Sequence, residues 1–231
     1  MERSRRDRPS RGARRDRRPQ TSPALPREAA EDVRAAAGGK GNRAVTFLEE
    51  AVAALDRGRP EDAVRAAQQA KVLAPRSGAV REVLGMALYR RERYREALRE
   101  LQAYRRFTGR ADQNHLIADA HRALGAPEKA LPLVRDALDA RIGIEARAEA
   151  AVVGGSALAD LGRYEEALTL LRRFDRGGDA ARPYDLRVWY VLGDVLERAG
   201  RTREAARTFR RIVDHDPEAF DAAERLARLG R

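Results

Sequence analysis

The sequence contains no cysteine, few aromatic residues and no long apolar run. Without cysteine the chain forms no disulfide and offers no thiolate ligand for zinc or an iron–sulfur cluster, which is compatible with a reducing cytoplasm. No uninterrupted apolar stretch approaches the roughly 18 residues that a membrane span needs. The charged amino terminus also lacks the apolar stretch of a secretory signal. We therefore expect a cytoplasmic protein without a membrane span.

Residues that carry chemistry are scarce as well. Of the three histidines, His115 and His121 lie six residues apart and point away from each other on a helix, and His215 is distant. His115 with Asp119 is an i, i+4 pair, but no further metal ligands accompany it. The glycines at 38, 39 and 41 fail the spacing of a nucleotide-binding loop, and no strand precedes them. The sequence therefore predicts no enzyme, no cofactor and no metal site.

The chain does contain the pattern of amphipathic helices. In residues 188–196, apolar side chains follow the i, i+3, i+4, i+7, i+8 spacing of one helix face. In the next segment Ala205, Phe209 and Ile212 share a face, and the arginines lie largely on the other. No segment alternates as a strand does over five or more residues. Two such helices joined by a short turn can bury their apolar faces only by packing on each other and on the neighbouring helix pairs. This requirement predicts an all-α solenoid.

A short pattern centred on an alanine recurs at intervals of 34, 33, 37 and 38 residues, the length of one helix-turn-helix unit. The recurring alanines are Ala63, Ala97, Ala130, Ala167 and Ala205. A small residue stands twelve positions before each of them, namely Ala51, Gly85, Ala118, Gly155 and Gly193. Five positions before the alanine, four copies have a glycine (Gly58, Gly125, Gly162 and Gly200), and the remaining copy has Glu92. Glycine suits a turn between helices because a helix end readily adopts positive φ.

Over residues 44–217 these positions resemble the tetratricopeptide repeat family. Pro75 and Pro217, each twelve residues after its alanine, match the family's closing proline, and Phe47 and Trp189 match its early aromatic residue. The resemblance implies a right-handed α-solenoid of about five repeats, in which the small residue lets the two helices of a hairpin approach closely. It also implies a non-catalytic scaffold or adaptor that binds a protein or peptide on its concave face.

The rest of the chain divides around these repeats. The expected segments are a disordered tail at 1–27, a short helix and linker at 28–43, the repeats at 44–217 and a C-terminal cap helix at 218–231. The first short helix is expected from Glu28 to Ala37. The cap helix is expected from Glu218 to Leu229, with an outward face that carries Glu224, Arg225 and Arg228.

The amino-terminal tail is rich in arginine. Residues 1–20 hold nine arginines and three acidic residues, a surplus of six positive charges out of the net +11. The tail has too few apolar residues to offset the entropy of ordering, which predicts disorder. The basic tail suggests an alternative function, that of a nucleic-acid- or ribosome-associated accessory protein anchored by this tail. A tail that only increases solubility would explain the arginines equally well. Residues 1–46 lack phenylalanine, tyrosine and tryptophan, and no base-stacking platform is expected, so such contacts would be nonspecific and directed to phosphates.

By the resemblance, the partner-binding residues lie on the first helix of each repeat, facing the inner curve. The expected set is Leu48, Val52, Asp56, Glu82, Met86, Tyr89, Arg90, Asp112, His115, Asp119, Arg122, Glu149, Val152, Ser156, Asp160, Arg187, Tyr190, Asp194, Glu197 and Arg198. Its acidic residues outnumber its arginines eight to four, which predicts a basic peptide as partner, with the tail itself as a competitor. Leu48 and Val52 stand where some related proteins place a lysine and an asparagine that clamp a carboxylate terminus, which disfavours such a clamp.

Two places depart from regular stacking. Pro132 falls within the second helix of the third repeat, where it removes an N–H and pushes on the carbonyl of Glu128, so a kink or a shortened helix is expected. The segment from Asp175 to Tyr184, with Gly177, Gly178 and Pro183, predicts a loop between the fourth and fifth repeats.

Overall fold

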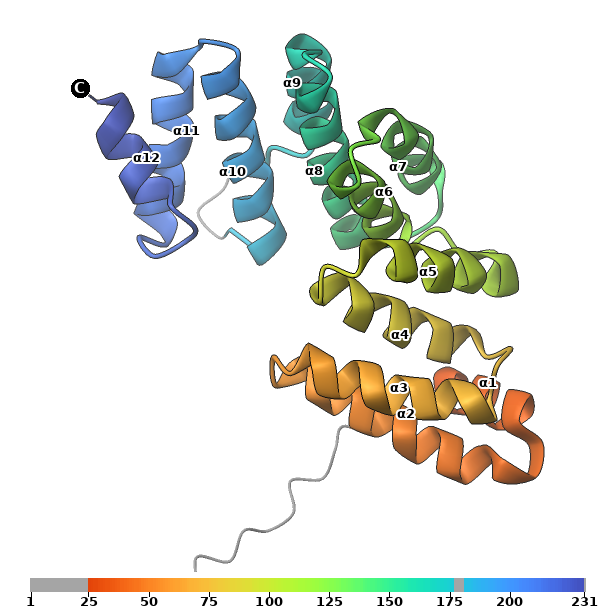
Figure 1. The fold of residues 1–231 in the computed structure, drawn as a ribbon. Helices are drawn as coiled ribbons and strands as arrows, with labels where there is room; N and C mark the ends of the chain where they lie inside the picture. Colours follow the sequence, from red (N-terminus) through yellow and green to blue (C-terminus); the bar gives the residue numbers. More distant parts are fainter. Residues whose placement is uncertain (1–24, 177–180, 231) are drawn as a thin grey trace, which may run out of the picture.

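A computed structural model describes residues 25–176 and 181–230 (Figure 1). Most of the arginine-rich tail, and Gly177 and Gly178 of the predicted loop, lie outside these ranges. Every regular element in the two ranges is helical, as the all-α prediction requires. In chain order the elements are α1 (Arg27–Ala37), the 3₁₀ turn η1 (Gly38–Lys40), α2 (Gly41–Asp56), α3 (Pro60–Leu73), α4 (Gly78–Arg90), α5 (Tyr94–Thr108), α6 (Asn114–Ala123), the 3₁₀ turn η2 (Pro127–Lys129), α7 (Ala130–Asp139), α8 (Ile144–Asp160), α9 (Tyr164–Arg172), α10 (Pro183–Arg198), α11 (Thr202–His215) and α12 (Ala222–Leu229).

The helices form hairpins that stack one after another along a curved path (Figure 1). Each hairpin has an inner helix followed by an outer helix. The inner helices are α2, α4, α6, α8 and α10, and the outer helices are α3, α5, α7, α9 and α11. Each inner helix after α2 packs against its own outer helix, the preceding outer helix and the preceding inner helix. The fold is therefore an α-solenoid, in which each hairpin buries its apolar face against its neighbours.

The small residue twelve positions before each repeat alanine lies where the two helices of a hairpin touch. A Cβ atom added to Gly193 would lie 2.8 Å from the ring of Phe209. Gly85 and Gly155 face Leu101 and Leu171 in the same way, at 2.6 and 2.7 Å. These distances leave no room for a methyl group, so the predicted close approach of the hairpin helices is confirmed.

The turn inside each hairpin uses a left-handed backbone at the position five residues before the alanine. Gly58, Gly125, Gly162 and Gly200 have φ between 66° and 76°. Glu92, at the same position of the second repeat, also has a positive φ, of 57°. The turn geometry is therefore common to all five hairpins, and Glu92 adopts it without the conformational freedom of glycine.

Pro132 shortens the second helix of the third repeat, as expected. The 3₁₀ turn η2 replaces the first turn of an α-helix, and α7 begins only at Ala130. Pro132 thus falls in the first turn of α7, where backbone N–H groups have no intrahelical acceptor. The absence of an N–H group in proline therefore removes no hydrogen bond there. The helix has 10 residues, fewer than the 15 and 14 of α5 and α11 and close to the 9 of α9, which contains no proline.

The predicted loop between the fourth and fifth repeats ends earlier than expected. Pro183 and Tyr184 were expected within the loop, but they form the first turn of α10. Proline favours this position because its φ suits a helix start and its missing N–H costs nothing there. The backbone N–H of Arg182 donates to the Asp185 carboxylate at 2.9 Å, which fixes the start of the helix.

The segment before the repeats is more compact than the expected helix and linker. The helix predicted from Glu28 to Ala37 is present as α1, but only η1 separates it from α2, which begins at Gly41. Val33 is fully buried and packs in one cluster with Val45 and Leu48 of α2. Helix α1 therefore covers the inner side of the first hairpin.

The cap helix α12 is shorter than expected, and Arg225 does not face outwards. Its side chain is buried, and its guanidinium lies 4.6 Å from the centre of the Phe209 ring. It also donates to the carboxylates of Asp194 and Glu197 at 2.9 and 2.7 Å. The prediction was wrong because carboxylates on α10, about 30 residues away in sequence, compensate the buried charge.

Candidate functional site

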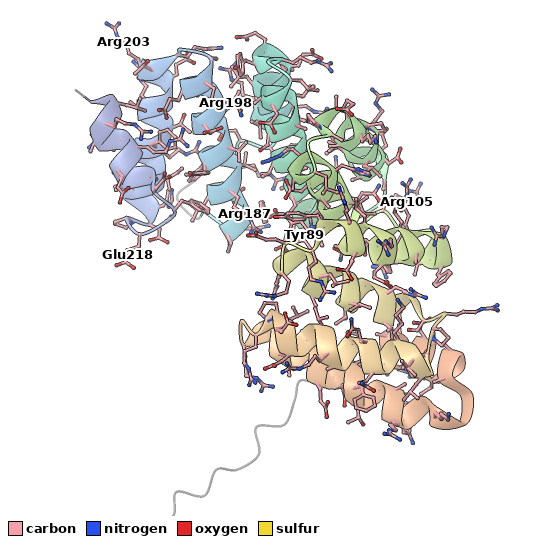
Figure 2. The ribbon with its side chains drawn as sticks, in the orientation of Figure 1. Tyr89, Arg105, Arg187, Arg198, Arg203 and Glu218 are labelled. Carbon is pink, nitrogen blue, oxygen red and sulfur yellow. The ribbon has the colours of Figure 1, made fainter. Side chains whose placement is uncertain are left out.

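The inner helices of the middle repeats form a groove with a volume of about 820 Å³. We call this cleft the inner groove. Tyr89 and Arg187, which are labelled in Figure 2, both line it although they come from α4 and α10. The lining residues are Met86, Tyr89, Arg90, Asp112, Gln113, His115, Leu116, Asp119, Arg122, Gly143, Glu145, Ala146, Glu149, Val152, Val153, Ser156, Arg187 and Val191.

The structure brings most of the expected concave-face residues of the middle repeats together in this groove. Those that line it are Met86, Tyr89, Arg90, Asp112, His115, Asp119, Arg122, Glu149, Val152, Ser156 and Arg187. The groove is also lined by Leu116, Val153 and Val191, which were not predicted and which stand fourteen residues before their repeat alanines. That recurring apolar position was a usable signal. Four further lining residues were not predicted either: Gln113, just before α6, and Gly143, Glu145 and Ala146 at the start of α8.

Other expected residues lie outside the inner groove. Leu48 is buried beneath α1. Glu82 accepts a hydrogen bond from Gln113 at 2.7 Å, and burial raises the pKa of its carboxyl group. The remaining residues outside the groove are Val52, Asp56, Asp160, Tyr190, Asp194, Glu197 and Arg198.

The chain's own terminal helices occupy both ends of the inner surface. At the amino-terminal end α1 packs on Val45 and Leu48. At the other end α12 packs on α11 and reaches α10 through side chains, since Arg225 contacts Asp194 and Glu197. Tyr190 also donates to Asp221, just before α12, at 2.7 Å. The inner groove is therefore the open portion between two stretches that α1 and α12 cover.

Ion pairs within the chain neutralise most of the inner-face carboxylates. Six of the eight expected acidic residues contact an arginine: Asp112 with Arg110, Asp119 with Arg122, Glu149 with Arg187, Asp160 with Arg122 and Arg198, Asp194 with Arg198 and Arg225, and Glu197 with Arg225 and Arg228. Three of these arginines, at 110, 225 and 228, were not in the expected set. The surplus of negative charge that the sequence predicted is therefore largely cancelled, because arginines from outside the inner helices reach into this face.

The pairs also connect successive inner helices. Tyr89 of α4 donates to Asp119 of α6. Arg122 of α6 lies 3.5 Å from Asp160 of α8, and Asp160 accepts from Arg198 of α10 at 3.1 Å. These polar contacts bridge neighbouring repeats at one end of the inner groove and fix how the inner helices sit beside one another.

His115 lies in the groove in its neutral form. Burial lowers the pKa of its imidazole below the usual value of about 6.5, and the nearby Arg187 acts in the same direction. Its Nδ1 lies 3.0 Å from the backbone carbonyl of Asp112, so Nδ1 carries the proton and donates. The neutral ring leaves Nε2 as an acceptor.

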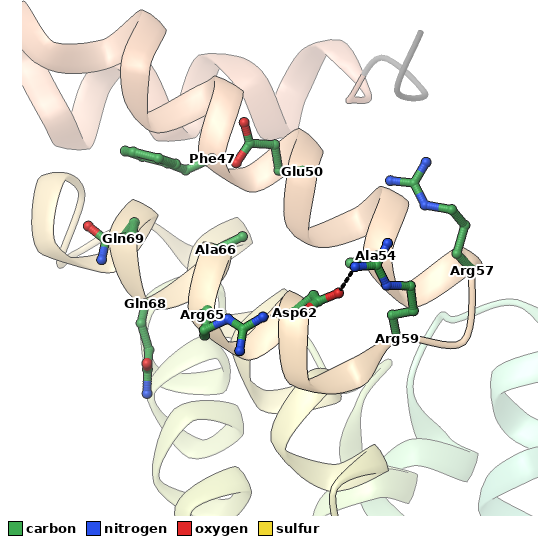
Figure 3. Close-up of a pocket in the computed structure, with 10 residues that line it drawn as sticks. All are labelled: Phe47, Glu50, Ala54, Arg57, Arg59, Asp62, Arg65, Ala66, Gln68 and Gln69. Atoms are coloured by element: carbon green, nitrogen blue, oxygen red, sulfur yellow. Dashed lines mark hydrogen bonds and ion pairs between the residues drawn. The ribbon is translucent and has the colours of Figure 1, made fainter. Parts of the chain in front are cut away.

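A second hollow opens between α2 and α3, at the amino-terminal end of the stack (Figure 3). It has a volume of about 500 Å³, and Arg59 and Arg65 both pair with Asp62 on its wall. Phe47 contributes its main apolar surface (Figure 3). It joins only one hairpin, whereas the inner groove joins residues of four, so we take the inner groove as the candidate site.

Two searches of the described ranges concern metal ligands and membrane spans. In residues 25–176 and 181–230, no three histidine, aspartate or glutamate side chains are grouped so that they could hold a metal ion. No helix in the same ranges is long and apolar enough to cross a bilayer. What the inner groove offers is apolar surface, hydrogen-bonding groups and paired charges, an arrangement suited to recognition of a ligand.

The fold defines a helical-repeat protein whose inner helices line a groove. Family models described as tetratricopeptide repeat match residues 48–113, 115–185 and 186–229. Since these matches cover well over half of the sequence, the chain belongs to the tetratricopeptide repeat family. A comparison with curated protein sequences found no match.

Solved structures of the same fold share little sequence with this chain. A thermophilic tetratricopeptide repeat protein of Thermus thermophilus, TTC0263, is 19% identical with a TM-score of 0.66, over 80% of this chain and 98% of its own. YrrB, described as a tetratricopeptide repeat protein with an unusual peptide-binding site, is 20% identical with a TM-score of 0.55, over 84% and 97%. The quorum sensor NprR of B. thuringiensis, in its apo form, is 13% identical with a TM-score of 0.66, over 87% and 62%.

Proposed function

We propose that this protein is a non-catalytic scaffold that binds an extended segment of a partner protein in the inner groove. The observation that carries the proposal is one groove lined by four successive inner helices and flanked by stretches that α1 and α12 cover. Two proteins of the same fold support it by analogy, since YrrB is described with a peptide-binding site and NprR in complex with its cognate peptide.

The apolar side chains of the groove define what such a segment must offer. Met86 of α4, Leu116 of α6, Val152 of α8 and Val191 of α10 are each half-buried and line the same groove. Packed helices lie about 8–10 Å apart, and an extended chain advances about 3.3 Å per residue. About three residues therefore cover one step between helices, and a polyproline-II segment, which repeats every three residues, turns every third side chain to the same face. A segment of about ten residues in this conformation, with an apolar side chain at every third position, fits the series of four.

Charged groups in the groove set the orientation of the segment and supply little net attraction. Glu149 pairs with Arg187, and Asp119 is held by Tyr89 and Arg122. Exposed or half-exposed pairs contribute about 0–1 kcal/mol each, so apolar contacts must supply most of the affinity. Binding should therefore depend only weakly on salt concentration.

A pair of matched substitutions tests the proposal. Ser156 lies in the groove and Thr169 on the exposed side of α9, and each hydroxyl donates to the carbonyl four residues earlier, at 3.0 and 2.8 Å. We expect Ser156→Trp to abolish capture of the partners that the full-length parent retains from a lysate, and Thr169→Trp to leave capture intact. Equal capture by both variants would exclude the inner groove as the binding site.

Nuclease treatment separates this function from the alternative. If partners bind in the groove, nuclease leaves them on the parent protein. Loss of all partners on nuclease treatment would favour the nucleic-acid- or ribosome-associated function that the arginine-rich amino terminus suggests.

A further inference from the structure

The positive charge of the described chain gathers on the outer helices, because the inner face is close to neutral. One cluster stands out on α9 and α11, and we call it the outer arginine patch. Its members are Arg172, Arg173, Arg203, Arg207 and Arg210, and all five are exposed. Arg203, Arg207 and Arg210 follow the i, i+4, i+7 spacing of one helix stripe. Figure 2 shows Arg203 directed away from the body of the protein.

Helix α10 packs on both α9 and α11, and side-chain ion pairs bridge these two outer helices. Arg172 lies 3.5 Å from Glu204, and Arg201 lies 3.3 Å from Glu165. In residues 25–176 and 181–230, that long contact of Arg172 is the one ion pair made by any member of the patch. Within that part of the chain the other four guanidinium groups donate to no carboxylate, so their N–H donors face a ligand there.

The chemistry of the patch favours a chain of phosphates over a protein or a bilayer. The large apolar side chains that the described ranges expose are Val72, Phe107, Leu124, Leu161 and Phe220, and none of them lies on α9 or α11. A protein interface needs an apolar centre, which this patch lacks. The patch lies on the outer helices of a curved stack, so a flat bilayer contacts only part of the patch. A flexible nucleic-acid strand can follow the curved surface and contact all of it.

We propose that the outer arginine patch binds the phosphate backbone of a single-stranded nucleic acid. Guanidinium groups match phosphate oxygens with paired N–H donors, and each contact releases condensed counterions. The patch offers no aromatic ring on which bases stack, so binding is independent of base sequence. This surface is separate from the inner groove, so the scaffold could hold a nucleic acid and a protein partner at the same time.

The chain offers a matched control on α5. Arg95 and Arg99 occupy the same repeat positions as Arg203 and Arg207, two residues before and two after the repeat alanine, and they are equally exposed. Carboxylates occur beside both helices, with Asp62 on α3 and Asp136 on α7 near α5, and Glu165 and Glu166 on α9 near α11. The two places differ at the repeat positions of Arg172, Arg173 and Arg210, which on α3 and α5 are Gln68, Gln69 and Gln102. Three fewer guanidinium groups therefore surround Arg95 and Arg99, so the attraction for a phosphate chain is weaker there than at α11.

The test is binding of full-length protein to a fluorescent mixed-sequence single-stranded oligonucleotide, measured by anisotropy at several salt concentrations. The variant R203Q/R207Q removes two phosphate contacts, so the slope of log affinity against log salt should fall by about 1.4, at about 0.7 per contact. The control variant R95Q/R99Q should lower this slope by less than half of the change expected for R203Q/R207Q. The amino-terminal arginines are the same in all proteins and cancel from the comparison.

Three results would overturn the proposal. The first is an equal change of the salt slope in the two variants, and the second is no change of the slope in either variant. The third is that R203Q/R207Q loses binding to anionic phosphatidylserine vesicles but keeps binding to the oligonucleotide. Thermal melts of both variants confirm that they fold. The groove variant Ser156→Trp should leave oligonucleotide binding unchanged, so failure of the scaffold proposal and failure of this one are distinguishable.

Discussion

Single residues in the hairpins follow a rule of compensating sizes. Where the small residue is glycine, the residue four positions after the repeat alanine is large, as with Gly193 and Phe209. Where it is alanine, that partner is smaller, as with Ala118 and Val134, which pack in one cluster. The sequence predicted the small residue at each position. It did not predict the compensation, because the contact between the two positions becomes evident only once the helices are placed.

This rule predicts the effect of adding a methyl group to Gly193. Gly193→Ala should destabilise the protein by about 1–3 kcal/mol, because the new Cβ would lie 2.8 Å from the Phe209 ring. In a Phe209→Val background the same change should cost much less, since alanine and valine already coexist at these positions in the third repeat. Urea unfolding of the four proteins of this cycle measures the coupling, and strictly additive losses would contradict the assigned contact.

Glu92 offers a stabilising change at the same scale. Its φ of 57° disfavours a residue with a Cβ, and its side chain is exposed. Glu92→Gly should raise the free energy of unfolding by about 0.5–1 kcal/mol, or the melting temperature by about 1–4 °C. Glu92→Ala removes the same charge but keeps the Cβ, so thermal melts should show no comparable gain. A gain of equal size in both variants would assign the effect to charge.

The helices were predicted well where local sequence determines them. Features that depend on contacts between residues distant in the sequence were predicted poorly. The inner and outer helices followed from apolar spacing, and the short α7 from the position of Pro132. The sequence analysis placed Arg225 on the outer face of the cap helix because a charged residue is usually solvated. Its partners Asp194 and Glu197 belong to α10, so the helix pattern of α12 alone held no sign of them.

The attachment of α12 should therefore depend on Arg225 and on pH. Burial acts to raise the pKa of the Glu197 carboxyl, but hydrogen bonds from Arg225 and Arg228 outweigh it and hold that pKa below its usual value. A depressed pKa gives stability above the unfolded value of about 4.3 that is lost as pH falls through the folded value. Arg225→Ala should cost about 1–3 kcal/mol at pH 7 and less near pH 3.5, as judged by urea unfolding at both values.

The exposed neighbour Arg228 serves as the control for this element. Its side chain is 65% exposed, although it also contacts Glu197, at 3.1 Å. Arg228→Ala should therefore cost less than about 1 kcal/mol at pH 7. An equal loss in both variants would show that the total charge near Glu197 matters, and not the buried position of Arg225.

At the scale of the molecule, the sequence predicted the inner face but not where it is open. Residues from α4, α6, α8 and α10 converge as repeat spacing requires. That α1 and α12 cover the two ends depends on contacts such as Val33 with Leu48, which no periodic pattern encodes. The charge of the inner face was mispredicted for the same reason, since Arg110, Arg225 and Arg228 reach it from outside the inner helices.

The solenoid is also unevenly packed along its length. A large apolar cluster holds the carboxy-terminal hairpins around Trp189 and Phe209, and further clusters hold the first two hairpins. The middle depends on smaller clusters, such as the one that contains Ile117. Helices α6 and α7 have only 10 residues each, and α6 lies beneath the inner groove. In a linear array of repeats, stability is set by each unit and its neighbours, so the third hairpin should open first.

Hydrogen exchange followed by mass spectrometry measures this difference directly. Amides of α6 and α7 should exchange faster than those of α2 and α3 and those of α10 and α11, because fewer apolar contacts must break to expose them. A partner segment in the inner groove touches all four inner helices, so it should slow exchange most in α6. Exchange that is uniform along the chain would contradict the uneven stability. Exchange that the partner slows only in the terminal hairpins would contradict the position of the groove.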